Sequence, residues 1–558
     1  MPTPTDPGDD LLIVPSAIQV ADELRLDVGA VPTGMIPLDG KPMLERLAEA
    51  YSDHDVTRVV AVGESADSIE TYVARSDYEW TVVDATGTQS LGETVYTALD
   101  AFNEESLIDR SVYLNFADTL ISPLRTVDDR SIVAYQERDR TYRWTTFDIE
   151  SDRITNATQK NKRSQDCPQP CFTGQFGLAD AGAFFDAMQD TPAELDSGLD
   201  YFYRALLSYL EPRTYELYQP ETWLDVGHLD TYHRAKKRFL NAREFNELEN
   251  HGKNVITKRS NDTETLINEI SWYENIPTGL QPYLPRIYDA STSPADAYVK
   301  MEYIGYPSLS DLQLYGSHRQ HIWNDVFDRL FSMHAEFMTY SADASQAEIQ
   351  SALRDMYLGK TRRRLDRLRE NARFQPFFDA DTVHINGEPH PGLSQILDCL
   401  DDVVADVGLL DMDSVSVIHG DLCLPNVLYD PRNEILKLID PRGEFGPFDI
   451  YGDPRYDLAK LRHSVVGHYE HLINGRFEAS GSENDTALTY NIYTTDGQKE
   501  REQRFDTMLA AETDADVKAV QLIEALLFLS MVPLHGDSFQ RQQCMLAQGI
   551  EKFAPHTP

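Results

Sequence analysis

The sequence of 558 residues predicts two consecutive domains, an α/β domain with a mostly parallel sheet followed by an α+β domain. The chain is too long for one hydrophobic core, because single cores stop growing at about 250–300 residues. Short apolar segments alternate with helical ones up to about residue 240, and long helical stretches dominate from residue 318 onward. This change in the expected pattern of secondary structure predicts domains at 1–238 and 239–558.

The first domain begins with a regular strand and helix pattern. The predicted strands are 10–17, 56–63, 80–85 and 110–121, and the predicted helices are 40–53, 65–76 and 91–103. Strands that alternate with helices form a parallel sheet covered by helices, so a Rossmann-like arrangement is expected. Residues 125–222 are β-rich and less regular.

The second domain is predicted to have two lobes. A helix over 232–248 leads into it, and strands at 254–260 and 297–304 flank a helix at 264–276. These elements form a small lobe of about 243–305, and the helical remainder forms a large lobe of about 306–558. Residues 474–497 are predicted to be a loop or hairpin insertion.

Composition limits location and partners. No run of eighteen apolar residues exists, so no membrane span is expected. The N-terminal stretch lacks the basic region of a signal peptide. Five cysteines are scattered, with only Cys167 and Cys171 close together, which favours reduced thiols and a cytoplasmic protein.

Charge excludes a nucleic-acid binder. Fifty Lys and Arg residues face 92 Asp and Glu residues, which gives a formal net charge of −42. The only basic cluster, "KTRRRLDRLR" at 360–369, has helical spacing and is predicted to be a solvated helix face. Acidity spread over the whole chain favours a halophilic protein, because concentrated salt screens the self-repulsion. An acidic interaction surface is the alternative.

The segment "VIHGDLCLPNVLYDPRNEILKLIDPRGEFG" at 417–446 carries the strongest chemical signal. Asp421 is followed five residues later by Asn426, and two short strands joined by a "DPRN" turn bring Asp440 back to the same place. Kinases use this spacing for a catalytic Asp, a metal-binding Asn and a metal-binding Asp. The spacing predicts phosphoryl transfer from ATP.

At these residues the chain resembles the aminoglycoside phosphotransferase and choline kinase superfamily, over roughly 243–558. The motif "HGDLCLPNVL…IDP" and the segment "GDPRYDLAKL" at 452–461 carry the resemblance. It implies a two-lobed, protein-kinase-like domain in which Asp421 accepts or orients the substrate hydroxyl, and Asn426 and Asp440 ligate Mg²⁺. It also implies structural roles for the loop residue His419 and for Asp453 and Asp457.

A kinase also needs a strand lysine for the ATP phosphates and a helix glutamate to hold it. Lys258 and Glu269 suit these roles, with Lys253 and Glu264 as rivals and a plain strand-edge lysine as the alternative. The segment "YVKMEYIGY" resembles the strand that leads into the kinase hinge. The backbone from Glu302 to Ile304 would then bind adenine. Cys423 stands where the superfamily frequently has His.

Residues 1–238 resemble the sugar-phosphate nucleotidyltransferases. The segment "IPLDGKPMLERL" at 36–47 and "ETWLDVGHLDTYHRA" at 221–235 are similar to segments of that family, and "GTQSLGETVYTAL" is similar to its nucleotide-selecting segment. The resemblance implies nucleotide contacts at Gly87 and Gly92 and a metal held by Asp118 and Asp225.

The phosphate-binding loop departs from the family pattern. The expected "GxGTR" is replaced by "IQVADEL" at 18–24, and Thr33 stands at the place of a phosphate-binding lysine. Loss of these cations removes stabilisation of the triphosphate, although Arg25 or Lys41 could compensate.

Together the two halves predict a bifunctional enzyme. A kinase using Mg²⁺ and ATP would phosphorylate a sugar, amino alcohol or polyol. A nucleotidyltransferase using CTP, UTP or dTTP would then activate the product for surface polysaccharide or lipid headgroup synthesis. The alternative is a kinase whose N-terminal domain only regulates or scaffolds. The partners expected are small-molecule substrates and nucleotides, and a homo-oligomer stays open.

Overall fold

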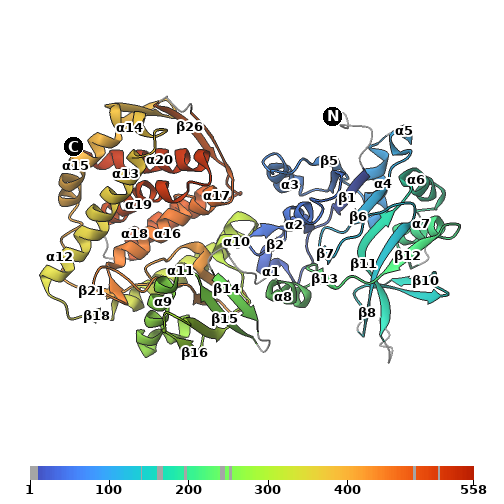
Figure 1. Ribbon diagram of the computed structural model, residues 1–558, viewed down its shortest axis with the longest axis horizontal. Helices are drawn as coiled ribbons and strands as arrows, with labels where there is room; N and C mark the ends of the chain where they lie inside the picture. Colours follow the sequence, from blue (N-terminus) through green and yellow to red (C-terminus); the bar gives the residue numbers. More distant parts are fainter. Residues whose placement is uncertain are drawn as a thin grey trace. The chain divides into compact units, whose positions relative to one another are not determined.

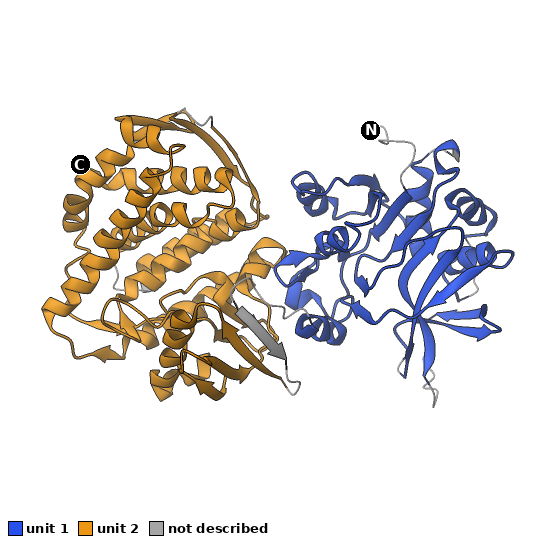
Figure 2. Cartoon of the chain, in the orientation of Figure 1, with its two compact units in different colours: residues 1–239 blue, residues 240–558 orange. Residues whose placement is uncertain are grey.

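The computed structural model describes residues 10–102, 104–139, 141–159, 168–193, 198–238, 246–250, 254–481, 486–512 and 516–557. The chain divides into two compact units, Met1–Phe239 and Leu240–Pro558 (Figure 2). Cys167 and Lys253 lie outside the described residues.

The N-terminal unit is an α/β unit built on a nine-stranded sheet among the described residues (Figure 1). Its central strands are parallel, as predicted, and lie in the order β6-β1-β4-β5. Helices lie between β1 and β4, between β4 and β5 and between β5 and β6, and they return the chain so that the next strand runs in the same direction. The strands from the β-rich stretch extend the sheet mainly by antiparallel pairing. The strands are β1 (Asp10–Ser16), β4 (Val56–Val62), β5 (Thr81–Asp84), β6 (Val112–Asn115), β8 (Ser131–Arg138), β9 (Thr145–Glu150), β10 (Arg153–Gln159), β11 (Gln169–Leu178) and β12 (Tyr215–Tyr218).

Helices cover this sheet, and two small ribbons complete the unit. The helices are α1 (Arg25–Val28), α2 (Met43–Ala50), α3 (Ala66–Val73), α4 (Leu91–Asp100), α5 (Glu104–Leu107), α6 (Ala181–Asp190), α7 (Tyr201–Leu210) and α8 (Leu229–Arg238), with a short turn η1 (Thr33–Met35). The ribbons pair β2 (Pro37–Leu38) with β3 (Lys41–Pro42) and β7 (Thr119–Ser122) with β13 (Thr222–Asp225).

Two predicted elements differ from the structure. The single strand expected over 110–121 is two strands, β6 and β7, and the break between them at 116–118 holds Asp118. For the helix expected over 232–248, the structure describes a helix at Leu229–Arg238 and a strand at Asn246–Asn250, and residues 239–245 lie outside the described residues. A Lys- and Arg-rich last turn at the end of α8 is favourable for a helix C-terminus, where the carbonyl dipoles point outward.

The C-terminal unit begins with an antiparallel sheet in the order β14-β15-β17-β16, with helix α9 packed beside it. A larger helical part follows, in which short two- to four-stranded sheets are interspersed. The strands are β14 (Asn246–Asn250), β15 (Val255–Ser260), β16 (Ile287–Ser291), β17 (Tyr298–Glu302), β18 (Ser341–Ala342), β19 (Thr382–Ile385), β20 (Glu388–Pro391), β21 (Val415–Val417), β22 (Val427–Asp430), β23 (Ile435–Leu438), β24 (Tyr451–Gly452), β25 (Phe477–Ser480) and β26 (Ala487–Ile492).

The helices of this unit bury one continuous hydrophobic core. They are α9 (Thr263–Asn275), α10 (Leu309–Leu314), α11 (Gln320–Met338), α12 (Gln346–Arg354), α13 (Lys360–Arg369), α14 (Gln375–Asp379), α15 (Leu393–Asp406), α16 (Pro454–Val465), α17 (Tyr469–Ile473), α18 (Gln498–Glu512), α19 (Val517–Met531) and α20 (Phe539–Phe553). Short turns lie at η2 (Thr278–Tyr283), η3 (Asp355–Gly359), η4 (Leu424–Asn426), η5 (Val532–Leu534) and η6 (Ala554–His556). The stretch 474–497 contains a β-hairpin, β25–β26.

One segment, Val517–Leu534, is long and apolar enough to cross a membrane by composition, with mean hydropathy 1.7. In the structure 67% of it is buried, and α19 packs against α16 and α20. Its fully buried Glu524 forms ion pairs with Arg462 and Lys552, so the buried face of this helix carries paired charges. These contacts are those of a core helix within a folded unit.

Candidate functional site

The C-terminal unit brings three predicted residues from distant segments into one buried contact. The Nζ of Lys258, on β15, lies 2.7 Å from Oε2 of Glu269 on α9 and 2.8 Å from Oδ1 of Asp440 after β23. Lys258 and Glu269 are only 6% and 4% exposed. Glu264 is exposed in the first turn of α9, so Glu269 is the glutamate that pairs with the lysine.

Burial and charge act against each other in this contact. Burial disfavours the charge on Lys258, but Asp440 and Glu269 outweigh it and raise the pKa of the lysine. Burial raises the pKa of Glu269 to about 7, against the opposing effect of Lys258. Asp440 adopts a φ of 56°, in the left-handed region that non-glycine residues seldom adopt. Such strain persists only where surrounding contacts hold it.

Asp421 and Asn426 form the second part of the site. The Asn426 amide nitrogen donates to the Asp421 carbonyl at 2.9 Å and to its carboxylate at 3.3 Å. The amide oxygen of Asn426 is therefore the atom it would give to a metal. Lys460 on α16 lies 2.7 Å from the other carboxylate oxygen of Asp421. Burial would raise the pKa of Asp421, but Lys460 reverses this and the net pKa is lowered, so the carboxylate stays ionised.

Lys460 is a site residue that sequence reasoning missed. It lies in the quoted segment "GDPRYDLAKL", three residues after Asp457 and therefore on the same face of α16. The i, i+3 spacing was the available signal. The contact of Lys460 with Asp421 could not be inferred from sequence, because it forms only where α16 packs against the loop.

The loop before Asp421 is held by backbone hydrogen bonds. The Asp457 carboxylate accepts the N–H groups of His419 at 2.6 Å and of Gly420 at 2.9 Å. The His419 ring is fully buried, with Nε2 3.0 Å from the Ile439 carbonyl, while Nδ1 accepts the Asp421 N–H at 3.3 Å. Burial lowers the pKa of His419 to about 4, so the ring is neutral and serves as a brace.

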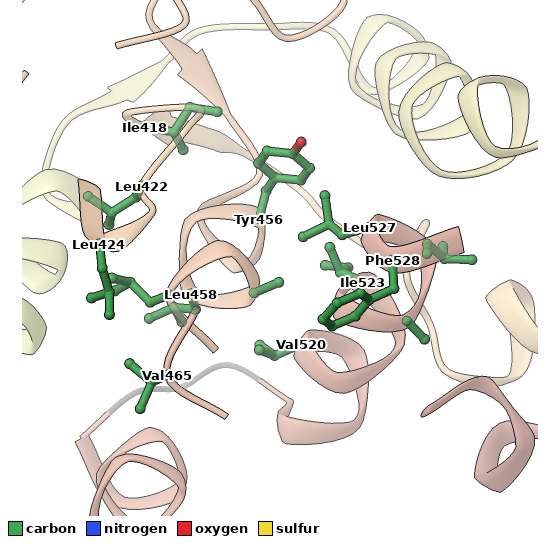
Figure 3. Close-up of a cluster of buried hydrophobic side chains, with 14 of the residues drawn as sticks. Ile418, Leu422, Leu424, Tyr456, Leu458, Val465, Val520, Ile523, Leu527 and Phe528 are labelled. Atoms are coloured by element: carbon green, nitrogen blue, oxygen red, sulfur yellow. The ribbon is translucent and has the colours of Figure 1, made fainter. Parts of the chain in front are cut away.

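Further contacts hold the start of α16 and the loop before Asp421. Asp453, with no exposed surface, accepts from the Tyr357 hydroxyl at 2.7 Å and from Arg455. The Trp272 indole of α9 donates to the Ile418 carbonyl at 2.8 Å. Figure 3 shows apolar side chains of the loop clustered with residues of α16 and α19; it labels Ile418, Leu422, Leu424, Tyr456, Leu458, Val465, Val520, Ile523, Leu527 and Phe528. The loop therefore rests on a packed core.

Two other predicted positions have distinct local environments. At the end of β17, Glu302 and Tyr303 donate their backbone N–H groups to the carbonyls of Arg286 and Asn254, both at 2.8 Å. Ile304 is thus the next residue able to offer a backbone donor to a ligand.

Cys423 is buried, and burial raises the pKa of its thiol far above the usual range, so it is an inert side chain.

The N-terminal unit places its two predicted acids side by side. Asp225 at the end of β13 pairs in register with Thr119, the neighbour of Asp118. The Val226 N–H donates to the Asp118 carbonyl at 2.9 Å. A Cβ on Gly227 would come within 2.3 Å of the Asp118 carboxylate, so a larger residue there would displace this carboxylate.

Electrostatics distinguish these two carboxylates. Burial, followed by the charge of Asp225, raises the pKa of Asp118 to about 6. Burial also acts on Asp225, but His228, Trp144 and Thr231 lower its pKa overall. The Trp144 indole donates at 2.6 Å and the Thr231 hydroxyl at 3.0 Å. A divalent cation would relieve the repulsion that Asp118 experiences.

The carboxyl ends of β1, β4, β5 and β6 share one edge of the sheet, where α/β proteins bind ligands. Gly87 follows β5 at this edge with a φ of 89°, a conformation suited to glycine. Gly92, at the start of α4, has a packing role instead. Its N–H donates to Asp200 at 3.0 Å, and a Cβ would clash with Tyr201 and the Phe202 backbone at 2.5 Å.

The loop that replaces the phosphate-binding sequence offers little free positive charge. Arg25 lies 3.2 Å from Asp22, and Lys41 lies 2.9 Å from Glu45 and also contacts Glu49. Thr33 is buried near the Ser16 hydroxyl at 3.4 Å. The two cations that could compensate, Arg25 or Lys41, are therefore both paired with carboxylates of the same unit.

Both sites have oxygen ligands of the kind that Mg²⁺ prefers. Over the described ranges, no group of three or more His, Cys, Asp or Glu side chains is arranged to hold a metal. Each site instead has a few carboxylate or amide oxygens, which suits an ion that completes its shell with water and substrate phosphate. The residues fit an ion that arrives with a nucleotide.

No protein-family model and no curated protein matches the sequence. Solved structures match the N-terminal two fifths of the chain. UDP-glucose pyrophosphorylase complexed with UDP-glucose is 17% identical with a TM-score of 0.35, and the match covers 42% of this chain and 100% of that chain. A putative glucose-1-phosphate thymidylyltransferase from Bacillus anthracis is 13% identical (TM-score 0.33, 42% and 97%). The CTP:phosphocholine cytidylyltransferase from Streptococcus pneumoniae is 12% identical (TM-score 0.33, 41% and 99%).

Proposed function

We propose that the C-terminal unit is a two-lobed, protein-kinase-like phosphotransferase that transfers the γ-phosphoryl group of ATP to a hydroxyl of a small molecule. The contact of Lys258 with both Glu269 and Asp440 carries this proposal. Phosphoryl transfer needs a lysine held by a glutamate near a metal-binding acid, and these residues come from three separate segments. An ordinary buried ion pair would not need the loop of Asp421 and Asn426 beside it.

The chemistry follows from the positions of these side chains. The acceptor oxygen attacks the γ-phosphorus, a new P–O bond forms, and the bond to the β,γ-bridging oxygen breaks, so that ADP leaves with the electron pair. Asp421 orients the hydroxyl and accepts its proton, which then passes to solvent. Asn426 and Asp440 would hold Mg²⁺, which supplies charge neutralisation at the phosphates. Lys258 would bind the phosphates, and Ile304 would donate its backbone N–H to adenine.

We further infer that the N-terminal unit handles a nucleoside triphosphate of the CTP, UTP or dTTP type. The adjacent Asp118 and Asp225, at the ligand-binding edge of the sheet, favour a nucleotidyl transfer that consumes the phosphomonoester made by the kinase. The pairing of Arg25 and Lys41 with carboxylates supports the alternative, a unit that binds nucleotide and acts as regulator or scaffold.

The kinase proposal is tested by following ADP formation with a panel of alcohol acceptors. Asp421→Ala should lower turnover at least about a hundredfold, because the variant cannot orient the hydroxyl. Asp449→Asn removes an exposed acid from the same region and should leave turnover unchanged. Equal turnover in wild type and Asp421→Ala would refute the role of Asp421.

Pyrophosphate release separates the two accounts of the N-terminal unit. Each of the four NTPs is supplied with candidate phosphomonoesters. Release that is lost in Asp118→Asn and retained in Asp421→Ala supports a bifunctional enzyme. Absence of release with every NTP favours the regulator or scaffold.

A further inference from the structure

A basic cavity lies beside the proposed phosphotransferase site. Its volume is about 620 Å³, within the usual range for small-molecule pockets. Five cations line it: Lys360, Arg363, Arg364, Arg367 and Arg442. The acids that share its wall are Asp355 and Glu444. This excess of positive charge occurs in a chain whose formal net charge is −42, so it is a local exception.

Most of the positive charge in the cavity is not neutralised by the protein. Arg363 pairs with Asp355 at 2.7 Å, and Glu444 accepts from the Asn268 amide at 3.5 Å. Within the described part of the chain, Lys360, Arg364, Arg367 and Arg442 form no ion pair within 4.0 Å. Burial lowers the pKa of Arg364, and the neighbouring arginines lower it further. Such a cluster is stabilised by a bound anion.

Two residues that line the cavity, Arg442 and Lys360, contact neighbours of Asp421. The Arg442 N–H donates to the His419 carbonyl at 2.9 Å, so Arg442 lies against the loop that carries Asp421. The Lys360 Nζ lies 3.3 Å from the Tyr456 hydroxyl. Tyr456 is one helical turn before Lys460, whose Nζ holds Asp421. A small acceptor with its hydroxyl at Asp421 would therefore extend into this cavity.

The wall also has an irregular backbone. Residues Asp355–Gly359 form a π-helical turn between α12 and α13, and such turns occur frequently at functional sites. The turn is followed immediately by Lys360 and by the arginines of α13. The sequence predicted these residues as a solvated helix face; in the structure, four basic residues of that helix also line a cavity.

We propose that the acceptor is an anion: a hydroxylated compound with a second group, a phosphate or carboxylate, that Arg364, Arg367 and Arg442 bind. This inference rests on the proposed phosphotransferase function and narrows its substrate class. Arginine binds planar or tetrahedral oxyanions through paired N–H donors, which explains the arginine content of the wall. A cationic amino alcohol is disfavoured by the same charges.

The first test varies the charge on a constant hydroxyl scaffold. A three-carbon series compares glycerol, glycerate, glycerol 3-phosphate and 3-amino-1,2-propanediol, and a six-carbon series compares glucose, glucuronate, glucose 6-phosphate and glucosamine. For the wild type, kcat/KM should be at least about tenfold higher for an anionic member than for the neutral one. A neutral or cationic member that equals or exceeds the anionic members overturns the inference. Comparison of kcat/KM between the phosphate-bearing and the carboxylate-bearing acceptors identifies the preferred oxyanion.

The second test uses variants of equal charge change. Arg364→Gln with Arg367→Gln alters the cavity, whereas Arg362→Gln with Arg369→Gln alters the same helix outside it, where Arg362 contacts Asp401 and Arg369 packs over Phe378. With a non-hydrolysable ATP analogue and Mg²⁺ at saturation, inorganic phosphate should raise the Tm of the wild type and of the control variant. It should not raise the Tm of the cavity variant. Equal stabilisation of all three proteins overturns the inference.

The two tests distinguish this inference from the proposed function. If Asp421→Ala and wild type hydrolyse ATP equally and no acceptor is phosphorylated, the phosphotransferase function fails and the inference fails with it. If acceptors are phosphorylated in an Asp421-dependent manner but without preference for anions, only the inference fails. Basal ATP hydrolysis should be equal in the wild type and the Arg362/Arg369 control.

Discussion

Replacement of Lys258 by methionine tests the buried contact on which the proposed site depends. The change removes Nζ, which makes hydrogen bonds of 2.7 and 2.8 Å to Glu269 and Asp440, and retains much of the apolar stem. An unpaired buried carboxylate would cost about 3–5 kcal/mol. Burial already raises the pKa of Glu269 to about 7, so this carboxyl can take up a proton when the lysine is absent. The expected loss of unfolding free energy at neutral pH is therefore only about 1–3 kcal/mol.

Activity should respond much more strongly than stability. Without Lys258 the phosphates of ATP lose their buried cation, and kcat/KM for ATP should fall at least about a hundredfold, equivalent to about 2.7 kcal/mol. Urea unfolding followed by tryptophan fluorescence measures stability, and ADP formation measures activity. Lys300→Met, on the neighbouring strand β17, is the control and should retain turnover.

Two results would refute this reasoning. If Lys258→Met retains ATP turnover within about threefold of wild type, the lysine has no role at the phosphates. If it loses about 5 kcal/mol or more, Glu269 does not protonate as argued. The double variant with Glu269→Gln should be less destabilised than the sum of the single variants, because the two side chains contact one another.

Three further predictions concern other parts of the chain. Burial raises the pKa of Glu470 to about 7, so the folded state favours its protonated form; this contribution is complete below about pH 4.5 and is lost as the pH rises to 7. Glu470→Gln should therefore flatten the pH dependence of urea unfolding by up to roughly 3 kcal/mol, and an unchanged slope would contradict the assignment. Gly227→Ala should displace the Asp118 carboxylate, because its Cβ would come within 2.3 Å, and should abolish any pyrophosphate release; retained release would exclude Asp118 from the reaction. KCl raised from about 0.1 to 2 M should increase the unfolding free energy, because salt screens the net charge of −42; a decrease would favour an acidic interaction surface over halophilic adaptation.

The fold could be predicted from the sequence where local pattern determines structure. Strand β1 and the hairpin β22–β23 lie where the apolar runs and the "DPRN" turn placed them, and Asp430 accepts backbone and side-chain donors of that turn. The break between β6 and β7 was missed because Phe116 and Ala117 continue the apolar run of the strand. Only the fold shows that the chain bends there and presents Asp118.

In the candidate site, too, the residues set by local spacing could be predicted from sequence and those set by tertiary packing could not. The spacing of Asp421 and Asn426 is local, and the short hairpin returns Asp440, so all three could be named from sequence. Lys460 could not be named, because its contact with Asp421 depends on how α16 docks against the loop. The arginines of α13 have ordinary amphipathic spacing, and the cavity beside them arises from the separate segment that carries Arg442. Contacts between segments that are distant in sequence depend on tertiary packing, and residue spacing does not predict them.

The most direct test of the central claim is ATP affinity with and without Mg²⁺, measured in an Asp118→Asn background that removes the proposed N-terminal metal ligand. Mg²⁺ should tighten ATP binding at least about tenfold, and adding Asp440→Asn should remove this gain while adding Asp449→Asn should not. An equal gain from Mg²⁺ in the Asp440→Asn protein would contradict the assignment of Asp440 and, with it, the phosphoryl-transfer site.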